Sequence, residues 1–288
     1  MSDVLDVIAR VRGGRGARRP WRAPGLLLPL LIVLLLLATA AAPHVFTTLA
    51  PDAVDTDAIL LPPSLVHWFG TDQLGRDVFT RVVHGTAQSL GISIGATLIG
   101  CAGGTLLGTA SALAPLGLQR LLVRLIDILL AFPEILLALL IIAVLGRGPA
   151  NTLLAVGLSS IAGYARLVRS QVLRVWQSGY VEHAVALGEP TGAIIARHVI
   201  PNAVRPLVVL ATIGVGNAVL SASALSFIGL GVVPPAAEWG ALLADGRKFL
   251  DTAPWISLLP ATVVAVSVIA ITLLGRRLQL LLSQGDVP

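Results

Sequence analysis

Six stretches of the chain are apolar over most of the length of a membrane-crossing helix. A helix crosses roughly 30 Å of hydrocarbon with about 20 residues. The stretches cover residues 26–42, 89–114, 125–145, 152–168, 203–230 and 256–274. The fourth is the weakest because Tyr164 and Arg166 interrupt it. The pattern predicts an all-α polytopic membrane protein with six transmembrane helices.

The composition supports this membrane class and excludes several others. Charged residues make up 12% of the chain, whereas soluble domains contain about 25%. Hydrophobic residues make up 56%, which excludes a soluble enzyme and a disordered chain. Cys101 is the single cysteine, so no disulfide can form within the chain. The net charge of +5 would suggest nucleic acid for a soluble protein. Basic loops also orient membrane helices, so we expect no nucleic-acid partner.

Basic residues gather on one side of the predicted helices. Most of the 20 lysines and arginines lie before the first helix, in the connections after the second and fourth, and after the sixth. Cytoplasmic segments of membrane proteins are enriched in these residues, so both termini are predicted to be cytoplasmic. The start of the chain also has the pattern of a secretory signal peptide ending near Ala42, but its long apolar run favours an uncleaved first helix.

The predicted helices divide the chain into five parts. They are a basic tail at 1–24, a first transmembrane helix at 25–46, an extracytoplasmic segment at 47–86, a five-helix transmembrane domain at 87–276 and a cytoplasmic tail at 277–288. The longest cytoplasmic connection lies inside the five-helix domain, at about 179–202.

The sequence lacks the motifs expected of a membrane enzyme or an ATPase. Lys248 is the only lysine and follows Arg247, so no Gly-Lys-Ser/Thr phosphate-binding loop is present. The 5 histidines fall in predicted loops or at helix ends, and no H-E-x-x-H zinc motif occurs. We therefore predict no catalysis and no metal site. Active transport would draw its energy from an ion gradient or from a separate ATPase subunit.

Two acidic residues, Asp127 and Glu134, fall inside the third apolar stretch. On one continuous helix they would lie on roughly the same face, and they could form a pore-lining or ion-coupling pair. Alternatively, Asp127 could pair with Arg124, and Glu134 could face the pore or a partner helix without titrating. Pro133 is expected to kink the helix between them. Both interpretations stay open at this point.

The connection at 179–202 predicts two short helices. The first carries an apolar stripe of Val181, Ala184, Val185 and Gly188, and Gly188 with Pro190 ends it. The second carries Ile194, Ile195 and Val199, and Pro201 ends it. An exposed apolar stripe is unfavourable in water unless something covers it. The pair is therefore predicted either to fold back on the membrane surface or to dock another protein.

A polar segment after the first helix predicts a tight turn. It contains Gly70, Thr71, Asp72, Gly75, Arg76 and Asp77. The glycines permit turn conformations, and the charged side chains can exchange hydrogen bonds. A catalytic Asp–Arg–Asp site is the alternative, but no nucleophile or cofactor motif accompanies it. We expect a structural turn.

The spacing in the connection resembles the EAA loop of ABC importer permeases. That pattern consists of E-A-A, three residues, G, nine residues and I-x-L-P. The residues in register are Glu182, Ala184, Gly188 and Pro201, whereas His183, His198 and Ile200 depart from the general pattern. The segments at 70–77 (GTDQLGRD), 124–133 (RLIDILLAFP) and 226–231 (SFIGLG) extend the match. Together they resemble the C-type permeases of dipeptide, oligopeptide and nickel importers.

The resemblance implies a type I ABC importer permease fold in a bacterial inner membrane. It implies a second permease, ABC ATPase subunits that bind ATP and Mg²⁺, an extracytoplasmic substrate-binding protein and surrounding lipids, with no cofactor on this chain. The implied ATPase-coupling residues are Tyr180, Glu182, His183, Ala184, Gly188, Ile195, His198, Ile200 and Pro201. Short peptides are the expected cargo, with nickel, glutathione and haem-like compounds open. The rival class is an autonomous secondary transporter or channel for a small solute.

Overall fold

The computed structural model describes residues 24–283, which form a bundle of helices with no strand in that range. The long helices are α2 (Pro24–Ala41), α3 (Val78–Leu113), α4 (Leu116–Ala131), α5 (Glu134–Leu145), α6 (Pro149–Trp176), α9 (Ile200–Phe227) and α11 (Trp255–Ser283). The shorter ones are α7 (Gly179–Ala186), α8 (Thr191–Ile194) and α10 (Trp239–Gly246), with single turns at Pro43–Val45, Ile195–Val199 and Arg247–Phe249. Most of the predicted amino-terminal tail and the last residues of the carboxy-terminal tail lie outside the described range.

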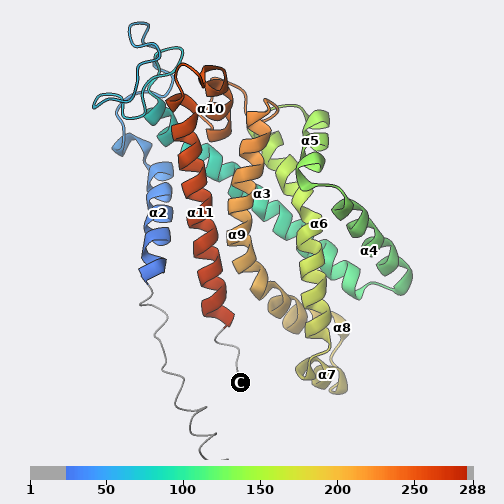
Figure 1. The fold of residues 1–288 in the computed structure, drawn as a ribbon. Helices are drawn as coiled ribbons and strands as arrows, with labels where there is room; N and C mark the ends of the chain where they lie inside the picture. Colours follow the sequence, from blue (N-terminus) through green and yellow to red (C-terminus); the bar gives the residue numbers. More distant parts are fainter. Residues whose placement is uncertain (1–23, 284–288) are drawn as a thin grey trace, which may run out of the picture.

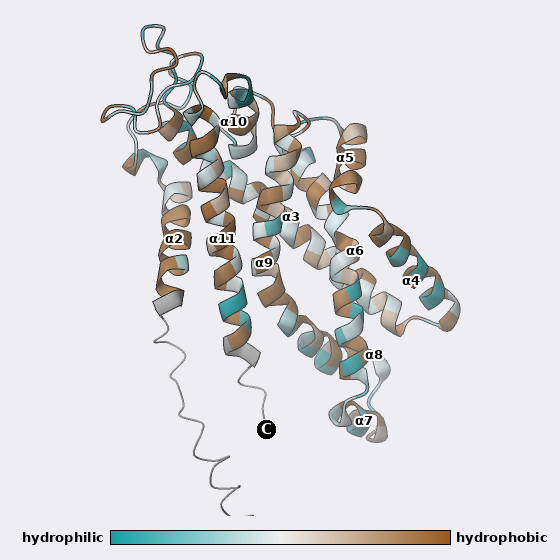
Figure 2. Ribbon diagram, viewed as in Figure 1, coloured by the Kyte–Doolittle hydropathy of each residue, from teal (hydrophilic) through white to brown (hydrophobic). Residues whose placement is uncertain are grey.

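The helices run between two ends of the molecule (Figure 1). We call the end with residues 42–77 and α10 the loop end, and the end with residues 177–199 the α7 end. Apolar residues dominate the middle of α2, α9 and α11, whereas the loop end is more polar (Figure 2). Within the described range, α3, the segment Thr191–Phe227 and α11 are long and apolar enough to cross a membrane. The α4–α5 pair qualifies only as a bent span, so the six-helix count stays a prediction.

The third apolar stretch is not one helix. The pair α4 and α5 meets at an angle of 95° at Phe132 and Pro133. Phe132 has an extended backbone (φ −89°, ψ 139°), because the ring of a following proline disfavours the helical conformation. The expected kink is therefore a full break. The prediction that Asp127 and Glu134 share a helix face is wrong, since they stand on different helices.

Helix α3 packs along α6 more extensively than any other pair of described helices. Glycines make the contact close. A Cβ at Gly104 would lie 2.3 Å from the Tyr164 Cβ, and one at Gly108 would lie 2.6 Å from the Ala165 carbonyl oxygen. Small residues let helices approach in this way inside membranes. The glycine-rich second stretch is thus the seam that holds α3 against α6.

The connection between α8 and α9 continues as helix. Residues Ile195–Val199 form a π turn that leads directly into α9. Pro201 lies in the first turn of α9, where a missing N–H is tolerated. The preceding residue, Ile200, donates its N–H to the Ile195 carbonyl oxygen. The prediction that Pro201 ends the second short helix is therefore wrong. Thr191–Phe227 therefore form one unbroken helical path, and α7 is joined to it through the turn at residues 187–190.

Candidate functional site

Two apolar side chains anchor α7 to the bundle. Val181 and Ala184 are 1% and 5% exposed. They belong to one buried cluster with Val172 of α6 and with Ile194 and Val199. The prediction that Val181 and Ala184 lie on an exposed stripe is therefore wrong, because their side of α7 packs inward. This buried contact packs α7 against the end of α6.

Other apolar side chains of α7 are exposed. Tyr180, Val185 and Leu187 are 46%, 55% and 83% exposed, and we call these three residues the α7 face. Glu182 and His183 are exposed as well. Sequence analysis missed Leu187 as a surface residue, because it caps α7 and helical periodicity does not assign a side to a capping position. An exposed apolar surface is present on α7, but side chains other than the predicted stripe form much of it.

Gly188 ends α7 in a left-handed conformation. Its φ is +78°, its N–H donates to the Val185 carbonyl oxygen at 3.0 Å, and the Glu189 N–H donates to the Ala184 carbonyl oxygen at 3.1 Å. Glycine is favoured at this position because it has no Cβ penalty. A Cβ on Gly188 would meet nothing within 4 Å. The structure therefore gives Gly188 a capping role and leaves open space around it.

The remaining predicted coupling residues gather beside α7. His198 Nε2 lies 3.5 Å from the Glu189 carboxylate, and the Tyr180 and His198 ring centroids are 6.4 Å apart. Ile195 and Ile200 are half-buried, and Pro201 is exposed. The structure thus brings the predicted residues together at one end of the bundle.

At the loop end, the predicted turn is a closely packed structure. Gly70 and Gly75 have φ values of +72° and +73°, and a Cβ on Gly75 would lie 1.7 Å from the Asp55 carbonyl oxygen. The Thr71 hydroxyl bonds to the Ala58 carbonyl oxygen. Backbone conformation and close packing therefore require the two glycines, and Thr71 contributes through its side chain.

The turn also contains a buried ion pair. The Arg76 Nε lies 2.7 Å from Asp72 Oδ2, and both side chains are about 5% exposed. Asp72 Oδ1 accepts hydrogen bonds from the Leu74 and Arg76 N–H groups. Asp77 caps α3 by accepting the Thr80 N–H at 2.7 Å. Asp72 and Arg76 therefore pair with each other, and Asp77 bonds to the first turn of α3.

Two further charged residues extend this network. Arg81 is 1% exposed and lies 4.0 Å from Asp72, while Arg76 lies 4.0 Å from Asp245 of α10. Burial raises the pKa of Asp245, and the nearby Arg81 and Arg76 oppose that change. Sequence analysis assigned neither Arg81 nor Asp245 to the turn, and Asp245 is far from it in the chain. The network ties the turn to α3 and α10 and is structural in character.

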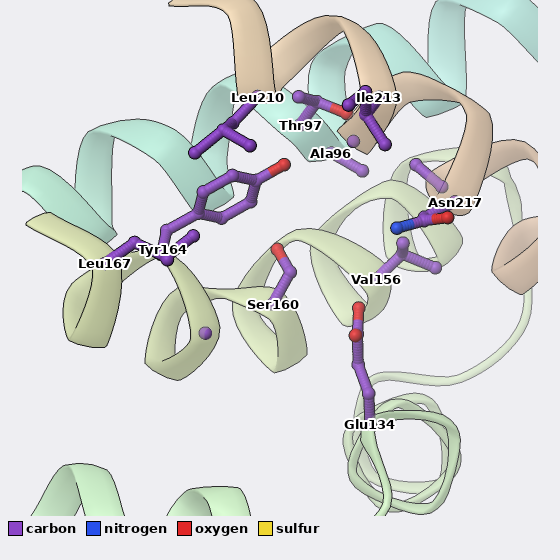
Figure 3. A pocket seen from close by; sticks show the side chains of 13 residues that line it. Ala96, Thr97, Glu134, Val156, Ser160, Tyr164, Leu167, Leu210, Ile213 and Asn217 are labelled. Carbon is purple, nitrogen blue, oxygen red and sulfur yellow. The ribbon is translucent and has the colours of Figure 1, made fainter. Parts of the chain in front are cut away.

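The two acidic residues of the third stretch have different surroundings. Asp127 accepts a 2.7 Å hydrogen bond from Arg166 of α6, and both side chains are more than half exposed. The suggested partner Arg124 is therefore wrong. Glu134 is also exposed, but its side chain points into a cavity of about 240 Å³ between α3, α5, α6 and α9 (Figure 3). The polar residues around it are Thr97, Ser160, Tyr164 and Asn217, none of which sequence analysis identified as a site.

Comparisons with known proteins agree with the arrangement of these helices. Residues 104–285 match the model of a family described as the binding-protein-dependent transport system inner membrane component. The chain belongs to this family. It is similar to the glutathione transport system permease protein GsiD of Escherichia coli O157:H7, with 42% identity over 87% of this chain and 81% of that protein. It is also similar to the dipeptide transport system permease protein DppC of Alkalihalophilus pseudofirmus, with 41% identity over 75% and 71%.

Solved structures show the same fold for this permease. A chain of the inward-facing MetNI methionine ABC transporter superimposes with a TM-score of 0.57 at 19% identity, over 70% of this chain and 95% of that one. A chain of an amino acid ABC transporter with histidines gives 0.55 at 17% identity, over 72% and 94%. The fold is that of a type I ABC importer permease.

The permease therefore has two candidate sites with different chemistry. The α7 face offers apolar contacts at one end of the bundle, and the cavity offers polar contacts inside it. Across residues 24–283, no group of three or more His, Cys, Asp or Glu is placed to hold a metal ion. Both sites suit binding and movement, in keeping with a transport subunit.

Proposed function

We propose that this permease is one of two membrane subunits of an ATP-driven importer, and that its α7 face docks on an ATPase subunit. ATP and Mg²⁺ bind the partner ATPases, and this chain binds neither. The observation that carries the proposal is the exposure of Leu187 and Val185 above the buried residues Val181 and Ala184. Large apolar side chains on a firm base form a surface suited to a protein partner.

The buried base of α7 also explains how motion reaches the membrane. Val181 belongs to one buried cluster with Val172 of α6 and Ile194 of α8, and the π turn at Ile195–Val199 joins α8 to α9 without a break. A closing ATPase pair that moves α7 would therefore move α6 and α9 with it. Those helices line the cavity that contains Glu134, which links ATPase motion to the interior of the bundle.

The orientation follows from the same assignment. With the α7 end in the cytoplasm of a bacterium, both termini are cytoplasmic and the loop end faces outward. The loop end is then the side on which an extracytoplasmic binding protein delivers its cargo, and lipids surround the apolar helices. The names of the similar permeases mention glutathione and a dipeptide, so short peptides are the cargo we propose.

A charge placed on the α7 face tests the docking. Leu187→Glu should abolish co-purification of the ATPases with the co-expressed permease pair, because an unpaired carboxylate buried in a contact costs several kcal/mol. Leu65→Glu is the matched control, since Leu65 is 96% exposed at the loop end, and it should leave co-purification intact. Normal ATPase capture by Leu187→Glu would contradict the docking site. ATP-independent uptake by the lone chain in vesicles would instead favour the secondary transporter.

A further inference from the structure

The cavity around Glu134 has a carboxylate without a partner. Within residues 24–283, no hydrogen bond or salt bridge reaches the Glu134 side chain, whereas Asp127 pairs with Arg166 at 2.7 Å. Figure 3 shows the Glu134 carboxylate directed into the space that Ser160 and Asn217 also border. An unpaired ionisable group among membrane helices is unfavourable unless it serves water, a partner or a ligand.

Two hydroxyl groups of the cavity, those of Thr97 and Ser160, are arranged to accept hydrogen bonds. Thr97 donates its hydrogen to the Ser93 carbonyl oxygen at 2.8 Å, and Ser160 donates to the Gly157 carbonyl oxygen at 2.8 Å. Each hydroxyl oxygen then has only acceptor capacity left, and an ionised carboxylate is also acceptor-only. Glu134, Thr97 and Ser160 together therefore favour a ligand group that donates several hydrogen bonds and carries positive charge.

Tyr164 is held in place at the edge of the same cavity. A Cβ on Gly214 of α9 would lie 1.9 Å from its hydroxyl oxygen, and one on Gly100 of α3 would lie 3.0 Å from its ring. The phenol thus occupies a slot that glycines on two helices leave open. Figure 3 shows its hydroxyl at the cavity, on the side of Leu210 and Ile213.

The cavity is also larger than a bare ion requires. Its volume of about 240 Å³ exceeds the roughly 30 Å³ that one water occupies in the liquid. A metal ion would leave most of this space unfilled and would find a single carboxylate. A charged group attached to a small organic body matches both the volume and the acceptors.

We propose that this cavity is a cargo subsite that binds the protonated amino terminus of a short peptide, with Glu134 as its counter-ion. Glu134 accepts one ammonium hydrogen bond, and two of the oxygens of Thr97, Ser160 and Asn217 accept the other two. The proposal rests on the proposed function, because it concerns the peptide that the importer carries. It adds a selection step inside the permease, after delivery by the binding protein.

The test compares two peptides that differ only in amino-terminal charge, tri-alanine and N-acetyl-tri-alanine. Their equilibrium binding is measured on the complete importer in lipid nanodiscs, without binding protein or nucleotide. The wild-type complex should bind tri-alanine about tenfold more tightly, which corresponds to about 1.4 kcal/mol. Equal binding of the two peptides, or no saturable binding of tri-alanine, would overturn the proposal without any mutant.

Variants then assign the preference to Glu134. Glu134→Gln should abolish it, Glu134→Asp should keep part of it, and Asp127→Asn should keep all of it. A preference that survives in Glu134→Gln would overturn the assignment. The binding assay contains no nucleotide, so it is independent of ATP-driven uptake. A failed binding result therefore contradicts the cargo subsite without contradicting the proposed function. Loss of ATP-driven uptake in the wild-type importer would contradict the proposed function instead.

Discussion

Arg166 of α6 donates a 2.7 Å hydrogen bond to Asp127 of α4. This contact ties the first half of the broken pair to the helix that carries α7. The two acidic residues of the third apolar stretch therefore have different surroundings. Asp127 has a cationic partner, whereas Glu134 faces the cavity. The two carboxylates are therefore expected to respond differently to neutralisation.

The orientation of the chain can be tested with single cysteines. In a Cys101→Ala background, Asp57→Cys should react with a membrane-impermeant maleimide added to intact cells, and Gln177→Cys should react only after the membrane is opened. Both positions are exposed, at the loop end and the α7 end respectively. Labelling of position 177 in intact cells would reverse the orientation and remove the basis for ATPase docking.

Substitutions at Gly188 separate its backbone role from a partner contact. Gly188→Ala should destabilise the cap by roughly 1–2 kcal/mol, because a residue with a Cβ is unfavourable in the left-handed conformation. Gly188→Asn should cost less, since asparagine tolerates this conformation. Gly188→Arg should have the same backbone strain as Gly188→Ala and, in addition, a bulky charged side chain. Lower ATPase co-purification for Arg than for Ala would show a contact, and equal values would limit Gly188 to capping.

The close packing of α3 against α6 predicts that a Gly→Ala substitution has different effects on stability at two positions of α3. Gly104→Ala should lower stability by about 1–3 kcal/mol through overpacking, because its Cβ would lie 2.3 Å from the Tyr164 Cβ. Gly91→Ala should be neutral or stabilising, since nothing lies within 4 Å of its Cβ and Ala favours helix. Thermal unfolding followed by tryptophan fluorescence measures both. Equal effects would contradict the packing.

The buried pair at the loop end predicts a large effect on stability. Asp72→Asn should cost about 3–5 kcal/mol, because it leaves the Arg76 charge buried with a neutral partner. Asp57→Asn is the control, since Asp57 is exposed, and its effect should stay within about 0.5 kcal/mol. The yield and unfolding temperature of the purified variants report the difference. Wild-type stability of Asp72→Asn would show that the turn does not depend on the pair.

Glu238 predicts a dependence of stability on pH. It caps α10 by accepting the Gly240 and Ala241 N–H groups and is 1% exposed. Burial raises its pKa above the ordinary value of 4.5, against the effect of those hydrogen bonds. The folded chain then binds this proton more tightly than the unfolded chain. Its contribution to the unfolding free energy is therefore largest below pH 4.5 and falls as pH rises through the raised pKa.

Glu238→Gln removes this titrating group and keeps an acceptor oxygen at the cap. Its unfolding temperature should decrease less than that of the wild type when pH rises from about 4.5 to neutral. Glu182→Gln is the matched control, because Glu182 is exposed. A wild-type pH profile for Glu238→Gln would assign the dependence to other groups.

Local patterns in the sequence were sufficient to predict the approximate helix positions, several turn and cap residues, and the family. The apolar stretches gave the approximate positions of the long helices except at the α4–α5 break, because burial in a membrane requires runs of apolar residues. Gly188 was recognised as a helix end, and Gly70 and Gly75 as turn residues, since a positive φ favours glycine wherever it occurs. The spacing from Glu182 to Pro201 was sufficient to indicate the family. All of these signals depend on residues that are neighbours along the chain.

Only the tertiary structure decided which way the side chains face. Periodicity placed Val181, Ala184 and Val185 on one stripe, but packing against α6 buries the first two and leaves Val185 exposed with Leu187. The cavity around Glu134 draws residues from four helices, and no local pattern marks them as neighbours. Such contacts arise when helices pack around one another, so a site of this kind is determined by the relative placement of segments that the sequence keeps far apart.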